Sequence, residues 1–143
     1  MSGPSLRKLD AHRAIHDGAF MEAQSLTEML NQLVEEKKEK EALQVADALI
    51  EHWEKRVITH ADSEEEGLYK EVVEKEPEMQ DKINMLTRDH DLLRIIAKKI
   101  RESLEKDSVS KEVLDFFASM LVVNEIHSRN EESWLLDYDH HHD

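Results

Sequence analysis

The sequence has no cysteine, three glycines and two prolines, and each shortage narrows the class of protein. Without cysteine the chain cannot form a disulfide framework, a thiolate metal site or an iron–sulfur cluster held by its own thiols. Few glycines and prolines, together with a charged fraction of 36%, suit long helices joined by short connections. The alternation of Val, Ile or Thr with polar residues that marks strands is absent, so we expect an all-α protein.

Positive charge and long apolar runs are also scarce. The 33 acidic residues outnumber the 19 Lys and Arg, and the formal net charge of −14 argues against nucleic acid and anionic membrane surfaces as partners. No apolar stretch is long enough to span a bilayer, and the opening MSGPSLRKLD lacks the apolar run of a signal peptide. We therefore expect a cytoplasmic protein that binds neither nucleic acid nor membrane.

The length of 143 residues predicts a single domain, 1–143, in which residues 136–143 form a flexible tail. This tail contains His140, His141 and His142. We leave these three out of the candidate site, because terminal histidine clusters bind metals only loosely and would confuse a metal assay.

Apolar residues recur at alternating steps of three and four along four segments, which is the pattern of amphipathic helices. The predicted helices cover residues 5–37, 41–74, 79–104 and 111–136. Pro77 and the segment 106–110 supply two of the breaks, and either Ser108 or Ser110 caps the fourth helix. Four long helices with short connections favour an up-down antiparallel four-helix bundle.

Two copies of one spacing carry most of the chemical information. His60 precedes Glu64 by four residues, and His127 precedes Glu131 by four. Each pair places an imidazole and a carboxylate one helical turn apart on the same face. Ionisable groups on an inward face are costly unless they are paired or bind a metal, so the two pairs predict a site in the bundle core.

Three further histidines fall on the inward stripes of the first and third helices. Counting outward from the connections between helices places His16, the pair 60–64, His90 and the pair 127–131 in one layer. His12 lies one turn from His16, or about 5.4 Å. That is still within reach of a centre whose two metal ions lie about 3.5–4 Å apart.

The donor set indicates which metal the layer suits. Five imidazoles and two carboxylates exceed the four ligands that zinc usually takes, and the mixture suits iron, less clearly manganese or zinc. Two ions bridged by the two carboxylates would use the whole set. A ferritin-like di-iron site needs Glu three residues before His, where this chain has Val57, Thr87 and Asn124, so that arrangement is excluded. The predicted metal ligands are His12, His16, His60, Glu64, His90, His127 and Glu131.

In chain order, the motifs are His, HxxxE, His and HxxxE on four successive helices, and this order resembles the hemerythrin-like family, also called HHE cation-binding domains. The segments HADSEEEGLY and HSRNEESWLL are similar to the family's signature, and the resemblance covers essentially the whole chain. It implies a non-heme di-iron centre with Glu64 and Glu131 as bridging carboxylates and the imidazoles as terminal ligands.

One departure from the family pattern concerns the third helix. The oxygen-carrying members place an HxxxH pair there, whereas this chain has Arg94 four residues after His90 and carries its HxxxH pair, His12 and His16, on the first helix. Our hypothesis assigns the two helix-one histidines and His60 to one iron, and His90 and His127 to the other, which keeps an open position. If a single helix-one histidine binds, the layer favours His16, while the local similarity of HRAI favours His12.

The resemblance implies several functions. The first is binding of a small diatomic ligand, oxygen or nitric oxide, for storage, transfer or sensing. The alternatives are a di-iron enzyme that reduces peroxide or nitric oxide with a redox partner, and a protein for iron handling or repair of iron centres.

Some neighbouring residues also have expected places. His52 is off the inward stripe and is expected at the surface, as are the three glutamates Glu65, Glu66 and Glu132 that follow the ligands. Tyr69 either packs in the core or contacts a bound ligand. Asn124 is either a hydrogen-bond donor beside the ligands or a polar core neighbour. Gly18, at a mid-helix position where glycine costs about 1 kcal/mol, either leaves room for a ligand or permits close helix packing.

Overall fold

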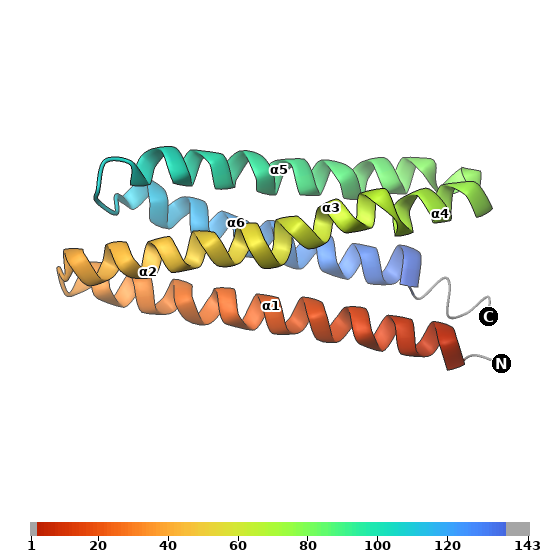
Figure 1. The fold of residues 1–143 in the computed structure, drawn as a ribbon, viewed down its shortest axis with the longest axis horizontal. Helices are drawn as coiled ribbons and strands as arrows, with labels where there is room; N and C mark the ends of the chain where they lie inside the picture. The colour runs from red at the N-terminus through yellow and green to blue at the C-terminus, as the bar shows by residue number, and fades with distance from the viewer. Residues whose placement is uncertain (1–2, 137–143) are drawn as a thin grey trace.

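The computed structural model describes residues 3–136, with the backbone alone described for residues 3–10 and 136. Of the predicted tail, 136–143, residue 136 is the last residue of a helix, and residues 137–143, with His140, His141 and His142, lie outside the described residues. The described part consists of helices joined by short connections and has no strand, so the predicted all-α four-helix bundle is confirmed. Figure 1 shows long antiparallel rods that run alternately in opposite directions, with the start of α1 and the end of α6 at the same end of the bundle.

The first and third predicted helices are continuous. The first is α1 (Gly3–Glu35), and the third is α5 (Gln80–Leu104), which follows a short 3-10 turn, η2 (Pro77–Met79). Between α1 and α2, Lys37 takes a positive φ of 61°, and Asp107 takes one of 56° before the last helix. Ser110 caps that last helix, because its hydroxyl accepts a hydrogen bond from the Val113 amide at 3.2 Å.

The second and fourth rods are interrupted by π-helical turns. The second consists of α2 (Glu39–His52), the π-helix η1 (Trp53–Ile58), α3 (Thr59–Glu66) and, after Gly67, α4 (Leu68–Lys75). The fourth consists of α6 (Lys111–Glu131) and the π-helix η3 (Glu132–Leu136). A π-turn holds more residues than an α-turn and so rotates the inward face, and such turns are frequent at functional sites.

The apolar core is divided into two clusters. The larger fills the half of the bundle nearest the two connections at the ends of α1 and α5, around Trp53 and Phe117. The smaller lies towards the chain ends and includes Tyr69, Leu86 and Leu135. The predicted ligand positions fall between the two clusters along the second, third and fourth rods, so a polar layer separates two apolar ones. Among the described helices, none combines the length and apolar composition that crossing a bilayer requires.

Candidate metal centre

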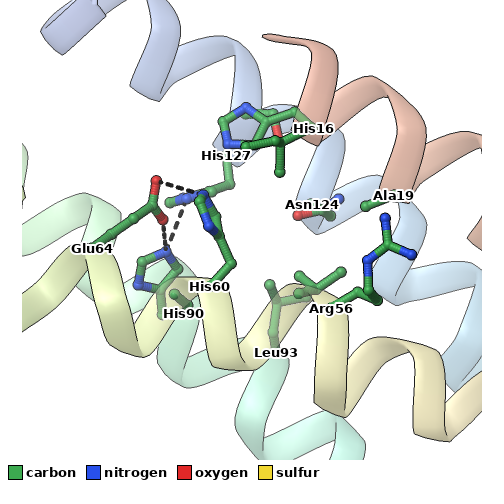
Figure 2. A pocket seen from close by; sticks show the side chains of 13 residues that line it. His16, Ala19, Arg56, His60, Glu64, His90, Leu93, Asn124 and His127 are labelled. Atoms are coloured by element: carbon green, nitrogen blue, oxygen red, sulfur yellow. Dashed lines mark hydrogen bonds and ion pairs between the residues drawn. The ribbon is translucent and has the colours of Figure 1, made fainter. Parts of the chain in front are cut away.

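The polar layer contains all seven predicted ligands, contributed by α1, α3, α5 and α6. Five of them are buried, and Glu131 is fully enclosed at 0% exposure. His12 and His60 are half-buried. Figure 2 shows several of these side chains converging from different helices on a common space. The fold therefore brings the predicted residues together, while their binding of a metal stays a prediction.

One group of four is wholly buried. A ligand atom from each of Glu64, His90, His127 and Glu131 lies within 4.8 Å of the others, a spacing that a single metal ion can span. The Nε2 atoms of His90 and His127 are only 3.0 Å apart.

A second group lies beside the first and shares Glu64 with it. A ligand atom from each of His12, His60 and Glu64 lies within 4.8 Å of the others. The ring of His16 completes a triangle with His12 and His60, with centroid distances of 6.2, 6.0 and 5.8 Å between the three rings. The layer thus contains two adjoining sets of imidazoles rather than one.

The two oxygens of Glu64 point to different sets. Its Oε1 atom lies 3.4 Å from the Nε2 atom of His90, and its Oε2 atom lies 3.4 Å from the Nε2 atom of His60. A carboxylate placed in this way reaches both groups at once.

Glu131 repeats the arrangement from the opposite rod. Its Oε1 atom lies 3.2 Å from the Nε2 atom of His16, and its Oε2 atom lies 3.5 Å from the Nε2 atom of His127. Both carboxylates of the HxxxE motifs therefore connect the set on α1 and α3 with the set on α5 and α6.

In three of the imidazoles the Nδ1 atom, which faces away from the centre of the layer, contacts a carboxylate. A carboxylate only accepts hydrogen bonds, so the Nδ1 atom facing it must donate, and the Nε2 atom of the neutral ring then presents its lone pair to the layer. This is the tautomer that a metal ligand needs. The Nδ1–carboxylate distances are 3.2 Å for His16 and Glu132, 2.7 Å for His90 and Glu65, and 3.0 Å for His127 and Asp89.

Two of these carboxylates were expected to face water, and that prediction is wrong. Glu132 is 3% exposed and Glu65 is half-buried. The residue after an inward ligand lies about 100° further round its helix, which in a bundle is the contact with the neighbouring rod. Glu65 thus meets α5 and Glu132 meets α1, whereas Glu66, one step further, is exposed as predicted. Sequence reasoning missed Asp89, although its place directly before His90 was the available signal.

Arg94 occupies the position where the oxygen carriers have a second histidine. It is not one of the predicted ligands but contacts carboxylates around the layer. Its Nη2 atom donates to Glu65 at 2.7 Å and to Asp62 at 2.6 Å, and its Nη1 atom donates to Asp91 at 2.9 Å. Arg94 therefore fixes the carboxylate that holds His90.

Tyr69 lies in the core and also contacts the candidate ligands. Its hydroxyl donates a hydrogen bond to Oε2 of Glu131, and its ring stacks on His90 at a centroid distance of 5.5 Å and an angle of 5°. Burial and the negative charges of Glu131 and Glu64 raise the pKa of Tyr69, so the phenol keeps its proton and remains a donor.

Two predictions for residues outside the layer are wrong. His52 is 7% exposed rather than at the surface, because it faces the small Ala19 of α1 and its Nε2 atom donates to the Ala19 carbonyl at 2.9 Å. Gly18 neither makes room for a ligand nor permits close packing. It is exposed, and no described atom lies within 4 Å of the place where a Cβ would be.

Protons are shared unevenly among the buried groups. Burial and the neighbouring Glu131 raise the pKa of Glu64 to about 11. Burial opposes ionisation of Glu131 too, but the neighbouring imidazoles of His127 and His16 lower its pKa well below the usual value. Burial and the charge of His127 lower the pKa of His90 to about 4. For His127, burial is outweighed by Asp89 and Glu131, which raise its pKa to about 9. The layer therefore carries protons where a cation would otherwise lie.

Unpaired atoms provide a test of whether the layer fits a metal. Within the described residues, four buried side-chain polar atoms lack a hydrogen-bond partner, and three of them belong to the layer: Nε2 of His60, Oε2 of Glu64 and Oε1 of Glu131. Leaving such groups unpaired in the interior costs about 1–3 kcal/mol each. One nitrogen lone pair and two carboxylate oxygens facing inward are the donors that a divalent cation binds, so these residues fit a metal centre.

Comparison with known proteins gives one match. The model of the hemerythrin HHE cation-binding domain matches residues 11–138, which include every predicted ligand. No curated protein and no solved structure matches the chain significantly. The family match and the buried group of histidines and glutamates both indicate metal binding. The chain belongs to the hemerythrin HHE cation-binding family.

Proposed function

We propose that this protein holds two non-heme iron ions in the polar layer and uses them to bind a small diatomic ligand, oxygen or nitric oxide, for storage, transfer or sensing. The observation that carries the proposal is the placement of the two carboxylates. Glu64 and Glu131 each direct one oxygen to each set of imidazoles, as two bridging carboxylates would. The mixture of imidazole and carboxylate donors suits iron.

The proposed ligands divide along the same line. The two helix-one histidines and His60 would hold one ion, and His90 and His127 would hold the other, with Glu64 and Glu131 common to both. Iron ions with an open position would supply the electrons that bind and polarise a small ligand.

The chain's own residues prepare this centre. Glu132, Glu65 and Asp89 keep three imidazoles turned with Nε2 inward, so little reorganisation is needed when a cation binds. Tyr69 holds Glu131 through its hydroxyl. The apolar clusters on either side limit the access of water to the layer.

Spectroscopy of iron-loaded protein tests the proposed ligand. The full chain is used with His140, His141 and His142 replaced by alanine, so that the tail cannot contribute metal. An optical band that appears with oxygen or nitric oxide and disappears when the gas is removed would support a binding protein. Irreversible oxidation by oxygen would instead favour the enzymatic alternative, reduction of peroxide or nitric oxide. Loading with zinc alone would contradict the proposal.

A further inference from the structure

A permanent positive charge is connected to the candidate metal centre through a single oxygen atom. The Oε2 atom of Glu65 lies 2.7 Å from the Nδ1 atom of His90 and also 2.7 Å from the Nη2 atom of Arg94. This oxygen therefore accepts one hydrogen bond from the imidazole and another from the guanidinium. Because arginine keeps its proton in proteins, the charge behind His90 does not depend on pH.

Arg94 is fixed beside the layer by more than one contact. It follows His90 by four residues, so both lie on the same face of α5, one turn apart. Its guanidinium also donates to Asp62 of α3 at 2.6 Å and to Asp91 of α5 at 2.9 Å, and the side chain is only 29% exposed. Without Arg94, three carboxylates would lie near this side of the layer with no cation between them.

This charge acts on His90 through two effects of the same sign. A carboxylate on Nδ1 makes an imidazole a stronger electron donor at Nε2, and a stronger donor favours iron(III) over iron(II). The Arg94 guanidinium attracts the carboxylate's charge and so weakens that donation. Its own charge also repels the more highly charged iron(III). Since His90 is 2% exposed, water screens neither effect strongly.

We propose that Arg94 is a positioning residue that acts through Glu65 and His90 to raise the reduction potential of the iron centre, and so favours iron(II). Reduction of iron(III) takes up one electron per ion, and the Nδ1 proton stays on His90. The inference rests on the proposed function, because iron(II) supplies the electrons that bind oxygen or nitric oxide. At this position the chain has thus replaced a metal-binding side chain of the oxygen carriers by a cation that cannot bind metal.

The test replaces Arg94 by glutamine in iron-loaded protein whose three tail histidines are alanine. The control is Arg101→Gln, seven residues or about 10 Å further along α5, where Arg101 pairs with Glu54 of the second rod at 2.7 and 3.1 Å. The midpoint potential is measured by anaerobic titration with dithionite and redox mediators, followed by the optical spectrum. Iron content is measured on the same samples.

We expect Arg94→Gln to change the balance between iron(III) and iron(II) about tenfold in favour of iron(III), which lowers the potential by about 59 mV. The control should change this balance less than about twofold, because its charge lies further from the layer. Equal potentials in the parent and Arg94→Gln would overturn the role of Arg94.

Two further variants separate an electrostatic role from a structural one. Arg94→Lys keeps the charge and should leave the potential close to that of the parent. Glu65→Gln removes the negative charge from His90 and should raise the potential, opposite to Arg94→Gln. A potential that falls or stays the same in Glu65→Gln would overturn the inference, and this variant decides if Arg94→Gln does not fold. A parent chain that binds no iron would contradict the proposed function instead.

Discussion

The two sides of the metal centre differ in how tightly the fold holds them. His90 and His127 are 2% and 3% exposed, and each is fixed by a carboxylate on its Nδ1 atom. On the other side only His16 is comparably buried and fixed, by Glu132, whereas His12 and His60 are half-buried. Imidazoles that are already oriented lose less freedom when they bind a metal. For the two ions proposed above, this difference predicts firmer binding on the side of α5 and α6 and easier exchange on the side of α1 and α3.

The largest effect is expected where the two sides meet. Replacing Glu64 or Glu131 by alanine removes an oxygen from both sides at once, so each variant should lose most of its iron. Metal analysis of purified protein, with circular dichroism to establish that the bundle is still folded, measures this loss. Near-full iron content in both variants would show that the carboxylates do not bridge.

The next prediction compares one imidazole from each side. His90→Ala should lose more iron than His12→Ala, because His90 is buried and held by Glu65, whereas His12 is half-buried. Iron is counted after dialysis against a weak chelator. A matching His16→Ala variant decides which helix-one histidine binds more strongly. Equal losses from His90→Ala and His12→Ala would contradict the proposed difference between the two sides.

The pH dependence of metal binding separates imidazoles that are ready to bind from those that must first lose a proton. The pKa values of Glu64 and His127, about 11 and about 9, lie above neutral pH, so the metal-free protein holds both protons at pH 7. Burial and the charge of His16 lower the pKa of His60, which is therefore already neutral. Iron(II) loading should release protons from Glu64 and His127, and the apparent affinity should rise from about pH 6 to about pH 8. The proton release is read with a pH indicator in weakly buffered solution. Affinity that is constant over this range would contradict the assignment.

The smallest expected effect is a change in stability at Gly18, in α1, the helix that contributes His12 and His16. Gly18→Ala should stabilise the protein by about 1 kcal/mol, since an exposed mid-helix glycine is replaced where no described atom obstructs a Cβ. Iron content should not change, because Gly18 does not line the common space on which the predicted ligands converge. Urea unfolding of metal-free protein measures the gain. A loss of iron would mean that α1 must yield at this point for its histidines to bind.

Sequence reasoning could predict the rods and the inward ligands because both depend on periodicity within one helix. The positions of Glu64 and Glu131 follow from the four-residue step after each histidine. The π-helical turns η1 and η3 could not be predicted, because one wider turn changes the apolar pattern too little to be read from one sequence.

The partners of the ligands were missed for a different reason. Glu65, Glu132 and His52 all lie at the flank of an inward stripe, where the periodicity of one helix predicts solvent. Whether such a flank meets water or a neighbouring rod depends on which helix lies alongside and on the size of its residues. The small Ala19 opposite His52 is an example. Those facts belong to the packing of two helices and are not encoded in the pattern of either one.

An anaerobic titration of iron(II) into the metal-free chain, with the three tail histidines replaced by alanine, tests the central claim most directly. The placement of two carboxylates between two sets of imidazoles predicts saturation at two iron ions per chain, with the second ion bound more weakly than the first. Saturation at one ion per chain would contradict the shared, two-sided centre.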